Sequence, residues 1–188
     1  DDMKIIRSFF DGFVHVLQPQ SFADERGYFM ESWRDETLSK ALGMDLHFVQ
    51  DNESCSANGV LRGLHYQWDP PQGKLVRCTR GKILDVVVDL RPSAVTFGQS
   101  ETVILSAENK HQLWVPPGFG HGFLSLMDDS MVLYKCTAHW SPDGESGIHP
   151  LDPTLNVDWP YPLNQIILSP KDAHAQTLAD YQVDPAFD

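Results

Sequence analysis

Residues 74–90, KLVRCTRGKILDVVVDL, decide the fold because they read as two strands joined by a tight turn. The second strand, residues 82–90, is rich in β-branched side chains and partly alternates, and Arg80-Gly81 before it is a hairpin signal. Further short strands follow, separated by turn residues, and they are predicted at residues 101–106, 112–115, 123–126 and 131–137. Many short strands at this spacing are typical of a β-sandwich or a barrel.

Helix is scarce in this pattern. Residues 34–42 predict one short helix, with Gly43 as its C-terminal stop. From about Trp140 the chain becomes rich in Pro and Asp, so we expect loops that wrap the barrel and one helical turn near residues 172–178. The whole chain, residues 1–188, is of a length that fits one domain.

Composition excludes several kinds of partner. The formal net charge of −12 argues against nucleic acid, because phosphate binding requires a basic surface. The apolar runs are too short to span a membrane, so no membrane partner is expected. Three unclustered cysteines, Cys55, Cys78 and Cys136, fit a reducing cytoplasm better than a disulfide framework.

His65, in the stretch GVLRGLHYQ at residues 59–67, is the first candidate for chemistry. An imidazole can take a proton near neutral pH, but a histidine in a strand is more often part of the core. The period of two places Arg62 and His65 on opposite faces of the strand unless a bulge intervenes, and Gly63 is suited to supply one. On these residues alone, a core histidine and a catalytic base remain equally supported.

A second motif, Pro116-x-Gly118-x-x-His121, resembles the second motif of the cupins, whose fold is a double-sheet jelly roll. Metal-binding cupins add a His-x-His sequence and a carboxylate. Here the first motif has Gln67 at the second histidine position, so we expect no metal. Tyr134 by itself reads as a sheet tyrosine and residues 169–172 as a solvated turn, and nothing local connects Asp172 to His65.

Taken together, residues 22–172 are similar to the dTDP-4-dehydrorhamnose 3,5-epimerase family. So many matching blocks in the same order argue against a chance match. The blocks are residues 22–31, 50–54, 59–67, 72–76, 85–91, 96–98, 112–116, 121–123, 134–135 and 152–153. The resemblance implies a mainly β fold, a double-stranded β-helix (cupin jelly roll) with a few short helices.

The resemblance also implies a reaction, the epimerisation of a nucleotide-linked 4-keto-6-deoxyhexose at C3, C5 or both, without a cofactor. The expected substrate is dTDP-4-keto-6-deoxy-D-glucose. A proton alpha to a ketone is weakly acidic, so a base must remove it while another group stabilises the enolate oxygen. By family analogy His65 is the base, Asp172 orients it, Tyr134 is the acid on the opposite face, and Lys74 steadies the enolate oxygen.

The family's contacts to the nucleotide and diphosphate fall on residues from several parts of the chain. They are Arg26, Glu31, Gln50, Asn52, Arg62, His121, Glu145 and Lys171. In several family structures the residues corresponding to Arg26 and Glu31 come from the N-terminal segment of a neighbouring subunit, so the resemblance implies a homodimer.

Two departures bear on specificity. Trp140 stands where many members have a second tyrosine that contacts the base or the sugar, and it is kept as a substrate-binding candidate. The sequence around His149-Pro150 resembles epimerases of antibiotic deoxysugar pathways, which often invert one centre, C3 or C5. A mono-epimerase is therefore the alternative within the family. A metal-dependent cupin and a non-catalytic cupin that binds sugar nucleotides are the alternatives from other classes.

Overall fold

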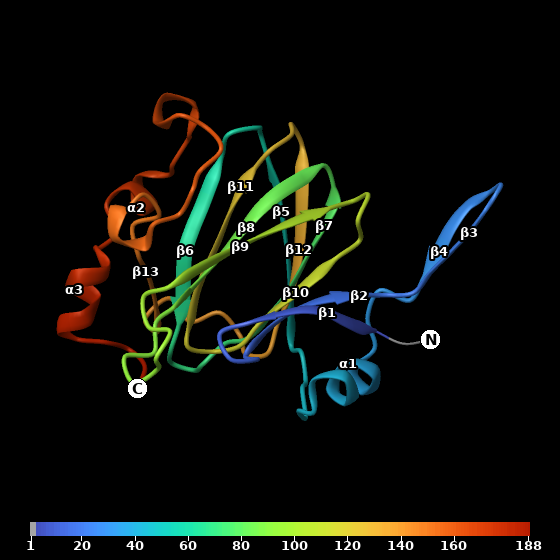
Figure 1. Cartoon of the computed structure of the whole chain (residues 1–188), viewed down its shortest axis with the longest axis horizontal. Coiled ribbons are helices and arrows are strands. Elements are labelled where there is room, and N and C mark those ends of the chain that lie inside the picture. The colour runs from blue at the N-terminus through green and yellow to red at the C-terminus, as the bar shows by residue number, and fades with distance from the viewer. Residues whose placement is uncertain (1–2) are drawn as a thin grey trace.

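The computed structural model describes residues 3–188, so residues 1 and 2 of the expected domain lie outside it. Two antiparallel sheets face each other (Figure 1). The six-stranded sheet has the order β1 (Lys4–Phe9), β2 (Val14–Gln18), β10 (Gln112–Val115), β7 (Lys74–Arg80), β12 (Ser130–Cys136), β5 (Gln50–Ser56). The five-stranded sheet has the order β13 (Glu145–Gly147), β6 (Leu61–Gln67), β11 (Phe119–Ser125), β8 (Lys82–Asp89), β9 (Ser100–Ser106). The predicted mainly β jelly roll is confirmed.

The main core fills the space between the two sheets. Val76 and Val132 from the six-stranded sheet pack there with Val87 and Phe123 from the five-stranded sheet. Strand β8 is buried over almost its whole length instead of alternating. The C-terminal segment explains this, because it covers the outer face of the five-stranded sheet and forms a second cluster there. Both faces of β8 are therefore shielded from water, which is why its sequence reads as a near-continuous apolar run.

The hairpin formed by β3 (Ser21–Asp24) and β4 (Gly27–Met30) projects away from the barrel (Figure 1). Helix α1 (Asp35–Leu42) follows it and ends at Gly43, whose φ of 64° is left-handed, as the sequence predicts.

The C-terminal segment holds more helix than expected. The 3₁₀ turns η1 (Pro153–Leu155) and η2 (Leu163–Gln165) precede α2 (Pro170–Ala173) and α3 (Leu178–Val183). The expectation of one helical turn near residues 172–178 is wrong, because Ser169 and Thr177 each accept a backbone N–H and so start separate helices.

Strand β11 begins at Phe119, four residues before the predicted start at residue 123. Gly120 and Gly122 look like turn residues in the sequence, but in the strand they are required because there is no space for a side chain. A Cβ on Gly120 would lie 2.8 Å from Val88 Cγ1, and one on Gly122 would collide with the carbonyl oxygen of Arg62. These glycines let two strands approach closely within the sheet.

Gly63 supplies the bulge that the sequence allows. Residues 62 and 65 of β6 pair with residues 123 and 121 of β11, so β6 has one extra residue between them. Gly63 has a φ of 115°, and a Cβ there would lie 2.7 Å from both Gly122 Cα and the His121 carbonyl oxygen. The bulge places Arg62 and His65 at the same pocket.

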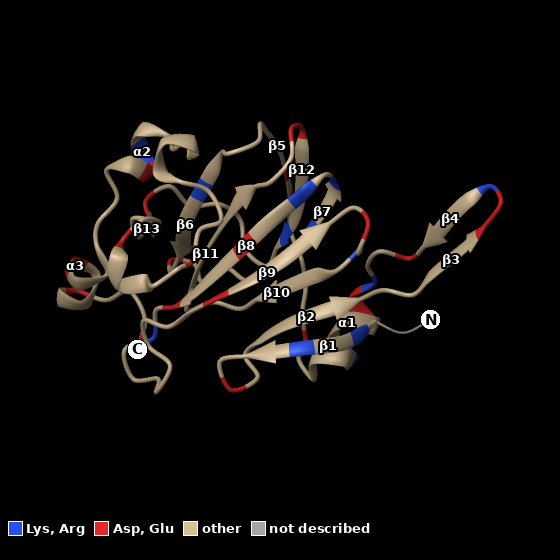
Figure 2. Cartoon of the chain, turned by 45° about the horizontal axis from the view of Figure 1, so that its top comes forward, with Lys and Arg blue, Asp and Glu red and all other residues tan. Residues whose placement is uncertain are grey.

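Charge is distributed over the molecule. Figure 2 shows Lys and Arg on several strands, and acidic and basic residues side by side at the tip of the β3–β4 hairpin. Within residues 3–188, no helix has the length and apolar character needed to cross a membrane.

Candidate active site

A pocket of about 630 Å³ opens between the two sheets. It brings together eight residues predicted for the site from sequence: Gln50, Asn52, Arg62, His65, Lys74, His121, Tyr134 and Trp140. His65 and His121 come from the five-stranded sheet, whereas Lys74 and Tyr134 come from the six-stranded sheet. A ligand in this pocket therefore has an imidazole on one side and a phenol on the other.

His65 is held by a carboxylate that lies far away in the sequence. Its Nε2 lies 2.7 Å from Asp172 Oδ1, and the backbone N–H of Gly63 donates to Asp172 Oδ2 at 3.1 Å. Burial alone would raise the pKa of Asp172, but the hydrogen bonds from His65 and Gly63 hold it below the usual value. An ionised Asp172 can only accept a hydrogen bond, so the proton of the neutral imidazole sits on Nε2 and Nδ1 of His65 is the nitrogen that is free to act as a base.

Lys74 and Tyr134 lie together on the other sheet. The Lys74 ammonium is 5.6 Å from the centroid of the Tyr134 ring. Burial lowers the pKa of Lys74 and raises the pKa of Tyr134, in each case because it disfavours the charged form. The site thus contains a half-buried lysine, whose charged form is disfavoured by burial, beside a phenol that keeps its proton at neutral pH.

A second histidine–carboxylate pair lies beside the first. His121 Nε2 is 2.8 Å from Asp85 Oδ2, and both side chains are buried. Burial raises the pKa of Asp85, and the charges of His121 and Lys74 oppose that rise. His121 and His65 are direct partners across β11 and β6, so the two pairs stand next to each other.

Of the remaining predicted polar residues, Arg62 lines the pocket, whereas Glu145 and Lys171 lie outside its lining and form an ion pair with each other. Arg62 Nε donates to Ser56 Oγ at 2.9 Å, and Lys171 Nζ lies 3.1 Å from Glu145 Oε1. Trp140 lines the pocket with 57% of its surface exposed. A flat aromatic surface at a pocket mouth is suited to stacking against a planar ring.

The chain matches the family model described as dTDP-4-dehydrorhamnose 3,5-epimerase over residues 11–180. The dTDP-4-dehydrorhamnose 3,5-epimerase of Methanothermobacter thermautotrophicus is 45% identical over 183 residues, which cover 97% of this chain and 98% of that protein. The chain belongs to this family. The predicted enzyme class, a sugar-nucleotide epimerase, is therefore confirmed.

Solved structures of the family have the same fold. The dTDP-6-deoxy-D-glucose-3,5-epimerase of Legionella pneumophila, in complex with dTDP-4-keto-L-rhamnose, superimposes with a TM-score of 0.89 at 47% identity and covers 94% of this chain and 93% of its own. A 3'-monoepimerase from Streptomyces bikiniensis, in complex with dTDP-quinovose, superimposes with a TM-score of 0.90 at 36% identity. The match covers 97% of this chain and 92% of that protein. Both double and single epimerases thus resemble this chain.

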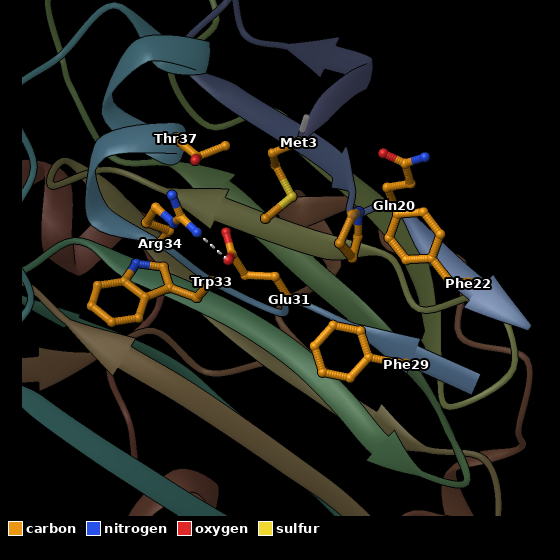
Figure 3. A pocket seen from close by; sticks show the side chains of 9 residues that line it. Met3, Gln20, Phe22, Phe29, Glu31, Trp33, Arg34 and Thr37 are labelled. Atoms are coloured by element: carbon orange, nitrogen blue, oxygen red, sulfur yellow. Dashed lines mark hydrogen bonds and ion pairs between the residues drawn. The ribbon is translucent and has the colours of Figure 1, made fainter. Parts of the chain in front are cut away.

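Arg26 and Glu31 lie apart from the pocket of their own chain. Arg26, at the tip of the β3–β4 hairpin, forms an ion pair of 2.6 Å with Asp24. Glu31 forms an ion pair of 2.7 Å with Arg34 in a separate hollow beside α1, together with Phe22 and Phe29 (Figure 3). Within one subunit, these two family positions do not join the residues around His65.

The sequence interpretation missed two residues of functional interest. Asp85 is a carboxylate within a buried β-branched strand, and this contrast is the signal that identifies it. Gln67, predicted only as a missing metal ligand, fixes the loop that carries Trp140. Its Nε2 donates to the carbonyls of Pro70 and His139, each at 3.0 Å, and its Oε1 accepts the Ser141 N–H at 2.9 Å.

No three side chains of His, Cys, Asp or Glu gather within residues 3–188 in a way that could hold a metal ion. The expectation of a reaction without metal or cofactor stays a prediction. His149 and Pro150 are not among the residues that line the pocket, and His149 Nδ1 accepts the Leu151 N–H at 3.1 Å. Of the two departures from the family sequence, Trp140 is the one in contact with the pocket.

Proposed function

We propose that this protein inverts both C3 and C5 of dTDP-4-keto-6-deoxy-D-glucose, without a metal or an organic cofactor. The observation that carries the proposal is the position of His65 and Tyr134 on opposite sheets of one pocket, with Lys74 beside Tyr134. Inversion requires a proton to leave one face of the sugar and another to arrive on the opposite face. Groups on facing sheets meet that requirement.

Each inversion follows the same steps. Nδ1 of His65 takes the proton from the carbon next to the ketone, and the C–H electron pair moves toward C4, which gives an enolate. The Lys74 ammonium stabilises the negative oxygen. Tyr134 then gives its phenolic proton to the opposite face of the carbon and the ketone re-forms. A proton passes from His65 to solvent and one returns to Tyr134, which restores the enzyme.

Substrate binding is proposed to involve two cations, of which Arg62 lines the pocket and Lys171 lies outside its lining. Arg62 and Lys171 are proposed to offset the charge of the diphosphate, with His121 as a further donor. Trp140 is proposed to stack on the planar base of the nucleotide or to cover the sugar. Gln50, Asn52 and Glu145 complete the proposed contact set, and a nucleotide-diphosphate sugar is the expected ligand.

The test is proton NMR of dTDP-4-keto-6-deoxy-D-glucose with the enzyme in deuterium oxide. Loss of both the C3 and C5 proton signals with formation of the doubly inverted sugar supports the proposal. Loss at one carbon only assigns the protein as a mono-epimerase, the alternative that the solved 3'-monoepimerase keeps open. Absence of exchange at both carbons refutes the proposal.

We further propose a homodimer in which the β3–β4 hairpin of one copy brings Arg26 and Glu31 to the pocket of the other. The exposed apolar side chains of the hairpin support this arrangement. Phe22, Tyr28 and Phe29 are 51%, 60% and 71% exposed, and a partner surface would shield them from water.

The cytoplasmic location inferred from the three cysteines, all of them free, also stays a prediction.

Mixed dimers test this arrangement. Arg26→Ala and His65→Asn should each be nearly inactive alone. In an equal mixture, half of the dimers contain one copy of each variant. Each mixed dimer has one intact site, which combines His65 of the Arg26→Ala subunit with Arg26 of the His65→Asn subunit. About a quarter of the wild-type activity should therefore return. If the mixture stays inactive while both proteins are folded and exchange subunits, the hairpin does not serve the partner's pocket.

A further inference from the structure

We propose that Gln50 and Asn52 form a hydrogen-bonded relay from the Trp140 loop to Tyr134, and that Asn52 is a positioning residue for the acid. This inference rests on the proposed function and assigns Asn52 a second task beyond substrate contact. The relay begins at the backbone of Trp140 and ends at the phenol.

The orientation of both amides follows from one unambiguous donor. The backbone N–H of Trp140 lies 2.9 Å from the side chain of Gln50, and a backbone N–H can only donate. Gln50 must therefore turn its oxygen toward Trp140, so its Nε2 faces Asn52 and donates to Asn52 Oδ1 at 3.0 Å. Asn52 is then left with its NH₂ group directed toward Cys136, at 3.7 Å from Sγ, and toward Tyr134.

Strand register keeps these groups together. On the antiparallel pair β5–β12, Asn52 lies directly opposite Tyr134 and Gln50 lies directly opposite Cys136. Residues two apart on a strand point to the same face, so all four side chains lie on one side of the sheet. Gln50, Asn52 and Tyr134 all line the pocket.

This orientation has a chemical consequence for Tyr134. When Asn52 donates to the phenolic oxygen, the phenolic proton must point elsewhere, and the pocket is the open direction. The phenolate that remains after proton transfer keeps the hydrogen bond from Asn52, which opposes the rise in the Tyr134 pKa caused by burial. Burial raises the pKa of Cys136 to about 11, so the thiol is neutral and does not compete as an anion for the amide.

Two substitutions test the relay, each read by the ratio of inversion to deuterium wash-out with dTDP-4-keto-6-deoxy-D-glucose. Asn52→Asp replaces the NH₂ donor with an oxygen, and Gln50→Glu keeps the acceptor for Trp140 but removes the donor to Asn52. In the second case the Asn52 amide turns over and presents its oxygen to Tyr134. We expect inversion to fall by about 10- to 100-fold in both variants, while wash-out by His65 falls by less than about threefold.

The matched control is Gln72→Glu. Gln72 Nε2 donates to the carbonyl of Ala138 at 2.9 Å, so this change also places a carboxylate beside the Trp140 loop. Gln72 takes no part in the hydrogen bonds that join Trp140, Gln50 and Asn52, and it does not line the pocket. Its ratio should equal that of the wild type. A double-mutant cycle adds a second readout, because Asn52→Asp should have no further effect on the ratio in a Tyr134→Phe background.

The relay would be overturned by a wild-type ratio in Gln50→Glu, by an equal fall in Gln72→Glu, or by additive effects in the cycle. A parallel fall of wash-out and inversion in Asn52→Asp would also reject it, since that pattern describes a residue that only binds substrate. These outcomes differ from failure of the proposed function, which is the absence of exchange with the wild-type enzyme itself.

Discussion

Replacing Asp172 with asparagine should damage the enzyme more than replacing it with alanine. The reason is that the two oxygens of Asp172 have different partners. Oδ2 accepts the backbone N–H of Gly63 at 3.1 Å, and Oδ1 faces His65 Nε2 at 2.7 Å. In Asp172→Asn the amide oxygen must stay on Gly63, because that N–H can only donate. The amide NH₂ then faces His65 Nε2 and selects the tautomer with the proton on Nδ1, which cannot act as the base.

The two variants should differ in size of effect. Asp172→Ala removes a charge-assisted hydrogen bond worth about 1.5–3 kcal/mol, which corresponds to a rate loss of roughly 10- to 150-fold. His65 remains free to adopt the active tautomer. Asp172→Asn fixes the inactive tautomer, and the equivalent change in a Ser-His-Asp triad reduces kcat by about 10⁴-fold. We expect Asp172→Asn to lose about 10³- to 10⁴-fold, at least tenfold more than Asp172→Ala.

The assay is the initial rate of deuterium exchange at C3 and C5 of dTDP-4-keto-6-deoxy-D-glucose, followed by NMR with saturating substrate. Thermal unfolding of each variant checks that the fold is retained. If Asp172→Asn is as active as Asp172→Ala, or more active, Asp172 does not set the tautomer of His65.

Other predictions concern pH, packing and acid stability. Because burial lowers the pKa of Lys74, the side chain should lose its charge, as the pH rises, before the usual lysine pKa of about 10.4 is reached. Lys74→Arg should therefore move the alkaline limb of the kcat/KM profile to higher pH. An unmoved limb would assign that limb to another group. Gly63→Ala should lower the free energy of unfolding by more than about 2 kcal/mol in a denaturant titration, because its Cβ would lie 2.7 Å from Gly122 Cα, and a loss under about 0.5 kcal/mol would contradict the close packing. The folded pKa of Asp172 lies below its unfolded value of about 3.9, so its contribution to stability is present above that pH and is lost as the pH falls through the folded pKa. The difference in unfolding free energy between wild type and Asp172→Asn should therefore shrink between about pH 5 and pH 2, and a constant difference would argue against an ionised Asp172 in the fold.

The parts of the fold predicted from sequence depend on local patterns. The Arg80-Gly81 turn and the β-branched stretch after it give β7 and β8 nearly at their observed bounds, and Gly43 ends α1 as expected. The predicted start of β11 is wrong because Gly120 and Gly122 look like turn residues in the local sequence. In the fold they are glycines because neighbouring residues leave no space for a Cβ, and the local sequence does not contain that information.

The same limit applies to the site. Gly63 signalled the bulge that brings Arg62 and His65 to one pocket. The contact of His65 with Asp172 joins residues 107 positions apart, and only the wrapping of the C-terminal segment around the barrel creates it. The role of Gln67 in holding the Trp140 loop was hidden for the same reason, since its partners are backbone groups whose position depends on the fold.

In the proposed mechanism, His65 on one sheet removes the proton and Tyr134 on the facing sheet returns one. This mechanism is tested most directly by measuring deuterium wash-out and inversion separately in His65→Asn and Tyr134→Phe. In deuterium oxide, His65→Asn should lose exchange and inversion together, because no proton leaves the sugar. Tyr134→Phe should lose most of its inversion while deuterium still enters the substrate with retained configuration, because His65 can remove and return protons on its own face. Equal loss of wash-out and inversion in Tyr134→Phe would contradict a base and an acid on opposite faces of the sugar.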